Sequence, residues 1–179
     1  MRERGRKDSS LRIGSWNVGS LTGKSAEVVE VMKRRRVNIM CLQETRWTRE
    51  GARGLVLGYK VWYVGQETSH MNKNGGARNG VGVILNERLS KEVIEVYRKN
   101  DKLIRVKLLC SKEIVNVISV YAPQVGLDEE DKRQFWKDLD EVVQGVHHTK
   151  KLYIGGDLNG HVGAIRDGYE SVHGGFGYG

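Results

Sequence analysis

Residues 152–161, LYIGGDLNGH, place an apolar run directly before two glycines, an acid and an amide. The apolar residues predict a buried strand, and the polar pair behind it would then lie at the edge of a sheet. Asp157 and Asn159 are candidates for catalytic chemistry at that edge. Asp-x-Asn-Gly is also a common turn composition, in which both side chains only bond nearby backbone amides. The stretch by itself leaves both interpretations open.

Three further segments are predicted to end a strand on a polar side chain. They are residues 11–18, which finish near Asn17, residues 37–42, which lead into Glu44, and residues 118–123, which contain Tyr121 and the only proline of the chain. Proline has no N–H to donate, so sheet pairing is expected to stop there. Glu44 is either a metal or acid–base carboxylate or half of a surface ion pair with Arg46 or Arg49, and the segment taken alone favours the ion pair.

The order of the predicted elements indicates an α/β fold. A strand, a helix over about residues 24–36 and a second strand follow within about 30 residues, which is a βα unit with a mostly parallel pair. Four strand-like runs then follow with short turns, as in an antiparallel meander, at 81–85, 93–97, 103–110 and 114–121. The alternation in residues 103–108 predicts one solvent-exposed face on that strand. A second helix is predicted from Asp128 onward.

Length and composition fit one domain with no membrane partner. A chain of 179 residues has room for one core, and no apolar run approaches the ~18 residues of a membrane span. We expect a flexible basic segment over residues 1–10 and the domain over 11–179. No signal peptide is recognisable, so an intracellular location is expected. Cys41 and Cys110 lie in apolar runs and are expected to be buried free thiols.

The charge of the chain favours a polyanionic partner. The net charge is +8, with about +12 over residues 1–110 and about −4 over residues 111–179. Such an excess favours nucleic acid through phosphate contacts and counterion release. The basic run 33–36 falls in the last turn of the first helix, where it can complement the helix dipole or touch phosphate.

The four strand-end motifs, taken together, resemble those of a known superfamily. The motifs are GSWNV (14–18), LQET (42–45), VYAP (120–123) and GDLN (156–159). In order and type they resemble the endonuclease/exonuclease/phosphatase superfamily. Within it they are most similar to the apurinic-type endonuclease domain of LINE-type retrotransposon reverse transcriptases and to craniofacial development protein 2-like sequences.

The resemblance implies a fold, a reaction and a role for each residue. The fold is a four-layer αββα sandwich of two sheets, and the reaction is Mg²⁺-dependent phosphodiester hydrolysis on DNA, with Mn²⁺ as a substitute. Glu44 and Asn17 would hold the metal, and Asp157 would orient and deprotonate the attacking water. Asn159 would bond the phosphoryl oxygens, and Tyr121 would contact the scissile phosphate. A nuclear location is expected in preference to a cytoplasmic one.

Two departures from the family pattern lower the expected activity. Gly19 stands where many relatives have an acid, and the sequence stops before the family's late aspartate and Ser-Asp-His motifs, which leaves the expected sandwich incomplete at its C-terminus. Neither His161 nor His173 has a Ser-Asp-His context. We therefore expect little nuclease activity. Two rival functions stay open, a non-catalytic nucleic-acid-binding or interaction protein and a phosphoesterase of small molecules or lipid headgroups.

Overall fold

The computed structural model describes residues 10–67, 76–124, 126 and 128–159. The elements in chain order are β1 (Ile13–Asn17), α1 (Ser25–Arg35), β2 (Ile39–Gln43), β3 (Glu50–Gly54), η1 (Val56–Gly58), β4 (Lys60–Val64), β5 (Val81–Leu85), α2 (Glu87–Ser90), β6 (Val93–Asn100), β7 (Leu103–Cys110), β8 (Glu113–Tyr121), α3 (Glu129–Gln144) and β9 (Lys151–Asp157). Nearly all of the predicted flexible N-terminal segment, His161 and His173 lie outside the described residues.

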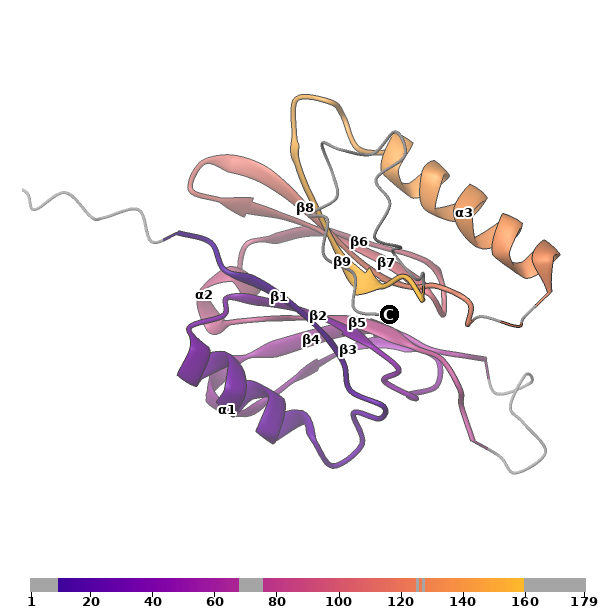
Figure 1. Ribbon diagram of the computed structural model, residues 1–179. Helices are drawn as coiled ribbons and strands as arrows, with labels where there is room; N and C mark the ends of the chain where they lie inside the picture. Colours follow the sequence, from indigo (N-terminus) through magenta and orange to yellow (C-terminus); the bar gives the residue numbers. More distant parts are fainter. Residues whose placement is uncertain (1–9, 68–75, 125, 127, 160–179) are drawn as a thin grey trace, which may run out of the picture.

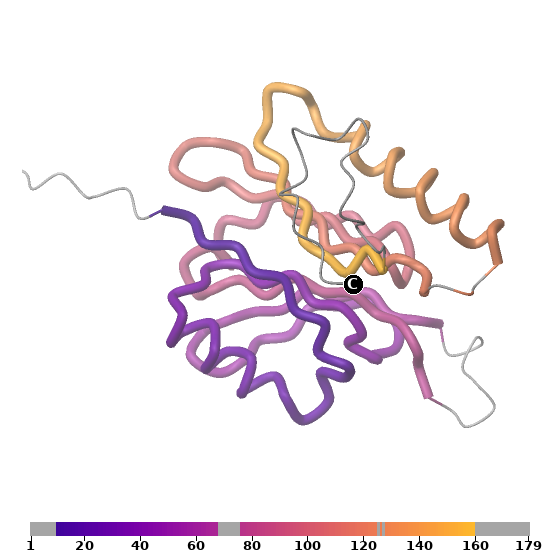
Figure 2. The backbone as a smooth tube through the Cα atoms, in the orientation of Figure 1, coloured from indigo at the N-terminus to yellow at the C-terminus, as the bar shows by residue number. Residues whose placement is uncertain are grey.

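The strands form two sheets that pack face to face. The first sheet has the order β1-β2-β5-β4-β3, and the second has the order β6-β7-β8-β9. Helix α1 covers the outer face of the first sheet and α3 covers the outer face of the second (Figure 1). The backbone trace shows the same four layers (Figure 2). The predicted αββα sandwich is therefore confirmed.

Three apolar clusters hold these layers together. Between the sheets lie residues such as Ile39, Val83 and Val106, all fully buried. The face of α1 that contacts the first sheet carries Val28 and Met32, at the helical spacing seen in the sequence. The corresponding cluster under α3 is made by Phe135, Leu139 and Val142 from the helix and by Leu103, Ile118 and Val120 from the sheet.

Parallel pairing brings the polar strand ends to one edge of each sheet. β1 and β2 are parallel, and their last paired residues are Asn17 and Gln43. β8 and β9 are also parallel, and their last paired residues are Tyr121 and Asp157. Since parallel strands finish at the same edge, each sheet presents two adjacent polar ends. The predicted parallel βα unit at the N-terminus is confirmed.

The predicted four-strand meander is wrong in one strand. Of these four strands, β6, β7 and β8 form an antiparallel meander, whereas β5 pairs with β2 and β4 at the centre of the first sheet. β5 is buried at every position, as a central strand requires.

The predicted exposed face of residues 103–108 is only partly present, because the Lys107 side chain is 35% exposed but Arg105 is buried. Arg105 is only 9% exposed, because α3 covers that face of β7. Its guanidinium donates to Glu95 at 2.9 Å and to the carbonyl of Val142 at 3.5 Å. The charge is buried with partners rather than left in solvent.

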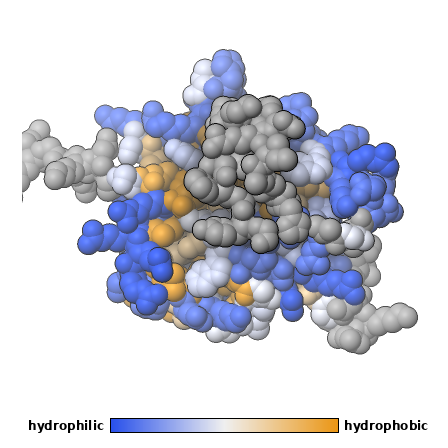
Figure 3. Space-filling view, in the orientation of Figure 1, coloured by the Kyte–Doolittle hydropathy of each residue, from blue (hydrophilic) through white to orange (hydrophobic). Residues whose placement is uncertain are grey.

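In the view of Figure 3, the outer helices present a polar surface, and apolar side chains are visible between the layers. Hydrophilic side chains cover α1 and α3, and hydrophobic ones show between the layers beside the start of β1 (Figure 3). On β9, the outermost described strand of its sheet, Tyr153 and Ile154 are exposed. No described helix is long and apolar enough to cross a membrane. Cys41 and Cys110 are both free, and Cys41 is fully buried as predicted, while Cys110 is half-buried.

Candidate active site

The four predicted strand ends meet where the two sheets face each other. The amide Nδ2 of Asn17 donates to Glu44 Oε1 at 2.9 Å and to Asp157 Oδ2 at 3.2 Å. From the other sheet, the Tyr121 hydroxyl donates to the same Glu44 oxygen at 2.7 Å. Residues separated by as many as 140 positions thus form one hydrogen-bonded cluster.

Glu44 is held as a carboxylate at the centre of this cluster. The hydrogen bond from Asn17 lowers the pKa of Glu44 most, and Tyr121 and Arg46 lower it further against the opposing effect of burial. Arg46 Nη2 lies 3.4 Å from Glu44 Oε2. The ion pair considered from the sequence therefore exists, and it coexists with the placement of Glu44 in the cluster. At neutral pH Glu44 is ionised and accepts from three donors.

The backbone at Glu44 adopts a left-handed conformation, with φ 53°. Its neighbour Thr45 is fully buried; its N–H donates to the carbonyl of Gly80 at 3.1 Å, and its carbonyl accepts from the N–H of Leu21 at 2.9 Å. A non-glycine residue in this region costs of order 1–3 kcal/mol and persists only where its surroundings fix it. The loop after β2 is therefore built to turn the Glu44 side chain toward the site.

Tyr121 is a hydrogen-bond donor rather than a base. Burial raises the pKa of Tyr121 to about 12, and the hydrogen bond to the Glu44 carboxylate adds to this effect. The residue is 5% exposed, and its ring belongs to the core between the sheets. Its hydroxyl also accepts from Gln124 Nε2 at 3.3 Å. The phenol therefore remains protonated across the physiological range.

Asp157 takes part both in a turn and in the cluster. Its Oδ1 accepts from the backbone N–H of Asn159 at 3.0 Å, which is the Asx turn that the sequence allowed. Its Oδ2 faces Asn17. Asn159 has φ 46° and donates through Nδ2 to the carbonyl of Ala122 at 2.6 Å. The turn thus fixes Asp157 while leaving one of its oxygens directed into the site.

Two glycines allow β9 to bring Asp157 this close. A Cβ on Gly155 would lie 2.9 Å from Cys41 Sγ, and one on Gly156 would lie 2.2 Å from Val120 Cγ2. Real Cβ atoms do not come this close to other heavy atoms, so any side chain here would push β9 away from β2 and β8. Close packing of β9 against β2 and β8 therefore requires glycine at both positions of the motif.

The donor set suits a hard divalent cation. Glu44 and Asp157 offer carboxylate oxygens on either side of the Asn17 amide. The Asn17 oxygen accepts from the N–H of Gly19 at 3.1 Å, so its nitrogen faces the carboxylates. No group of three or more His, Cys, Asp or Glu residues in the described ranges is placed to hold a metal. Two carboxylates fit Mg²⁺, which keeps several waters and binds substrate phosphate.

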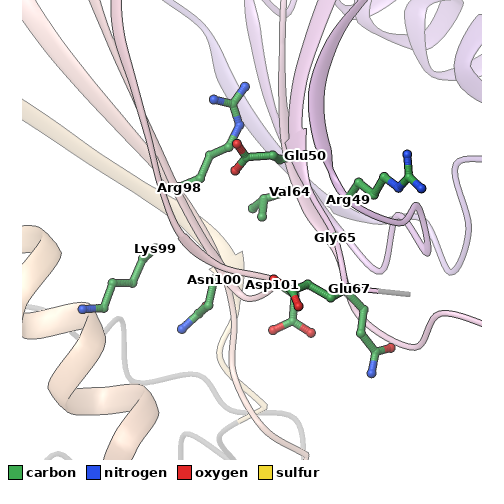
Figure 4. A pocket seen from close by; sticks show the side chains of 10 residues that line it. Arg49, Glu50, Val64, Gly65, Glu67, Arg98, Lys99, Asn100 and Asp101 are labelled. Carbon is green, nitrogen blue, oxygen red and sulfur yellow. The ribbon is translucent and has the colours of Figure 1, made fainter. Parts of the chain in front are cut away.

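A cleft of about 750 Å³ lies at the same end of the sandwich as the cluster, between β3 and β4 of the first sheet and β6 of the second. Its lining comes from both sheets and comprises Arg49, Glu50, Val64, Gly65, Gln66, Glu67, Arg98, Lys99, Asn100 and Asp101 (Figure 4). Arg98 spans the sheets by donating to the carbonyls of Tyr63 and Gly51. Lys99 turns toward α3, where its amine lies 2.7 Å from Glu141. Sequence patterns gave no signal for this cleft, because its residues come from the ends of β3, β4 and β6 and the loops beside them, which are far apart in the chain.

A family model matches most of the chain. Residues 14–169 match the model of the Endonuclease/Exonuclease/phosphatase family. The chain belongs to this family. The match covers all five site residues predicted from the sequence, from Asn17 to Asn159.

Two relatives connect the chain to mobile elements and to a developmental protein. It is 33% identical over 153 residues to craniofacial development protein 2 of Bos taurus, covering 85% of this chain and 24% of that protein. It is 32% identical over 151 residues to the RNA-directed DNA polymerase from mobile element jockey of Drosophila melanogaster, covering 84% of this chain and 15% of that polymerase. The chain thus spans a quarter or less of each of these relatives.

The fold is shared with solved nucleases. An AP endonuclease from Archaeoglobus fulgidus superposes with a TM-score of 0.62 at 24% identity, over 85% of this chain and 58% of that one. At this identity the likeness concerns the arrangement of sheets and helices.

Proposed function

We propose that this chain carries the catalytic carboxylates of a metal-dependent DNA endonuclease of the retroelement type. Membership of the family supports phosphodiester hydrolysis on nucleic acids in general. The observation that carries the finer proposal is the convergence of Asn17, Glu44, Tyr121 and Asp157 into one cluster, at the end of the sandwich where the cleft also opens. The basic N-terminal part of the chain favours DNA over a small or lipid phosphoester.

Each residue has a role that its contacts allow. Asp157 orients water and takes its proton through Oδ2, the oxygen that its turn leaves free. Tyr121 stays protonated, and its single O–H, which donates to Glu44 in this structure, can turn to donate to charge at the scissile phosphate when substrate binds. Asn159 supplies a further amide donor from the adjacent turn. The Asn17 amide holds the two carboxylates in place.

Glu44 and Asp157 would hold Mg²⁺ through their carboxylate oxygens, with Mn²⁺ as a substitute of the same ligand preference. When bound, the ion supplies neutralisation of the charge that develops on the phosphoryl oxygens. Asn17 can be a metal ligand only if its amide oxygen, and not its nitrogen, faces the carboxylates. The hydrogen-bond network determines which of the two amide orientations is adopted.

We expect slow turnover from the 179-residue chain. Within the described ranges the histidines are His147 and His148, which stack beyond the end of α3 and not at the site. In the described ranges no histidine donates at the site, and loss of one donor to developing charge lowers a rate by roughly 10²–10³-fold.

Nicking of supercoiled plasmid with Mg²⁺ tests the proposal. We expect weak nicking by the wild-type chain, lost in Asp157→Ala and in Glu44→Ala. Asp140→Ala is the matched control, because Asp140 is an exposed acid of α3 bonded to Gln144. Nicking by the wild type no faster than by Asp157→Ala would overturn the proposed reaction.

The second candidate is a nucleic-acid-binding protein without catalysis. The ion pair between Arg46 and Glu44 favours it, since a paired carboxylate is less available to a cation. Binding of DNA that weakens steeply with salt, in a chain that never nicks, would support this candidate.

A further inference from the structure

A polar strip lies directly beneath the candidate site, inside the otherwise apolar core between the sheets. The Gln43 side chain is 1% exposed and Ser119 is fully buried. Gln43 Nε2 donates to Ser119 Oγ at 3.2 Å, and Gln43 Oε1 accepts from Ser15 Oγ at 3.2 Å. Ser119 Oγ in turn donates to the carbonyl of Leu42 at 2.9 Å. One carboxamide therefore joins β1, β2 and β8.

The three joined strands carry three of the four cluster residues, Asn17, Glu44 and Tyr121, while Asp157 ends β9. Ser15 lies two positions before Asn17, and Ser119 lies two positions before Tyr121, so each pair shares one face of its strand. Gln43 immediately precedes Glu44. The distances between β1, β2 and β8 at these hydrogen bonds therefore set the distances between Asn17, Glu44 and Tyr121, which follow on the same strands.

Gln43 also anchors one flank of a strained residue. Glu44 has φ 53°, and both of its neighbours are buried and hydrogen-bonded. Thr45 is fixed through its backbone to Leu21 and Gly80, while Gln43 is fixed through its side chain to the opposite sheet. The strained conformation is thus held on the Gln43 side by contacts that cross the sandwich.

We propose that Gln43 is a positioning residue that holds Glu44 within hydrogen-bond reach of Tyr121. It acts through the spacing of β2 and β8 and touches neither substrate nor metal. Its effect on cleavage rests on the proposed function. Its effect on the bond between Tyr121 and Glu44 does not, since that bond can be measured without DNA.

The first test compares cleavage kinetics of two core variants. Gln43→Met keeps the length and volume of the side chain but removes both hydrogen bonds. We expect kcat to fall by roughly 10–100-fold with an unchanged KM for DNA, because misplacing a catalytic group by about 1 Å has an effect of this size. Val83→Ala is the control, because it thins the same core from β5, which carries none of the five site residues. It should leave kcat unchanged.

The second test is a double-mutant cycle on unfolding, without DNA or metal. Tyr121→Phe should raise the unfolding equilibrium constant roughly ten-fold in the wild-type background, since it removes a hydrogen bond to a charged group. The same change should raise it less than about two-fold in Gln43→Met, where Glu44 is no longer aligned, and roughly ten-fold in Val83→Ala.

The outcomes separate the two proposals. If the wild type does not cleave DNA, the proposed function fails, and the cycle still decides the role of Gln43. An effect of Tyr121→Phe that is equally large in all three backgrounds would overturn the positioning role. If Gln43→Met does not fold, Ser119→Ala replaces it in the cycle, because it removes the acceptor on β8 and should give the same loss of coupling.

Discussion

The Tyr121 hydroxyl donates a 2.7 Å hydrogen bond to the Glu44 carboxylate and so joins the two sheets at the candidate active site. Glu44 follows β2 of the first sheet, and Tyr121 ends β8 of the second. The bond explains why the two residues affect each other's ionisation. It favours the charged form of Glu44 and the neutral form of Tyr121.

Tyr121→Phe should destabilise the fold and slow cleavage. It removes the hydrogen bond to Glu44 while keeping the ring in the core, so we expect a loss of about 1–2 kcal/mol in the free energy of unfolding. Denaturant titration measures this loss, and a nicking assay measures the rate. Tyr97→Phe is the control, because the Tyr97 ring lies near Arg105 on the outer side and is partly exposed. Equal losses from both variants would contradict the special role of Tyr121.

The free energy of unfolding should depend on pH through this same pair. The pKa of Tyr121 rises from 10.0 to about 12 on folding, so its contribution is complete below pH 10 and disappears as the pH rises toward 12. The pKa of Glu44 is lowered, so its contribution is present above pH 4.5 and disappears as the pH falls further. The difference in stability between wild type and Tyr121→Phe should therefore be constant between these limits and shrink outside them. A difference that shrinks near neutral pH would contradict this account.

Gly156→Ala should damage the site through packing alone. The new Cβ would meet Val120 Cγ2 at 2.2 Å and the Val120 carbonyl oxygen at 2.4 Å, so β9 must move. Overpacking of this kind costs about 1–3 kcal/mol. Gly54→Ala on β3 is the matched control, because a Cβ there meets no atom within 4 Å. Melting curves of both variants should show a clear loss only for Gly156→Ala, with its nicking rate lowered as well.

The sequence predicted those features that depend on residues close together in the chain. Asn17, Glu44, Tyr121 and Asp157 could be placed at strand ends because apolar runs mark buried strands and polar residues mark their limits. β3 was missed, because the sequence EGARG has no apolar alternation and becomes a strand only by pairing with β4. The sequence also did not predict that α3 buries Arg105. This burial depends on contacts with residues far along the chain, such as Val142, which is 37 positions away.

Arg49→Ala should weaken DNA binding and lower its salt dependence. Arg49 is exposed and lines the cleft at the same end of the sandwich as the site, so under the proposed function its charge is available to a DNA phosphate. Loss of one phosphate contact should reduce the slope of log K against log salt by about 1. Arg88→Ala is the control, because it removes the same charge at a place away from the cleft. Arg88 is an exposed residue of α2, and α2 follows the end of β5 that is farther from the cleft. Titrations at several salt concentrations should separate the variants, and equal slopes would show that the cleft does not face DNA.

Mg²⁺ should stabilise the wild-type chain but not Glu44→Gln. The glutamine keeps an oxygen that can accept from Asn17 and Tyr121, so the fold should survive while the charge at the centre of the cluster is lost. At an Mg²⁺ concentration 100 times its dissociation constant, binding adds about 2.7 kcal/mol to the free energy of unfolding. Thermal melts with increasing Mg²⁺, followed by addition of a chelator, measure this effect and its reversal. Glu95→Gln is the matched control, since Glu95 pairs with Arg105 away from the site and its variant should keep the full Mg²⁺ response. If Glu44→Gln responds to Mg²⁺ as the wild type does, Glu44 is not a ligand of the ion.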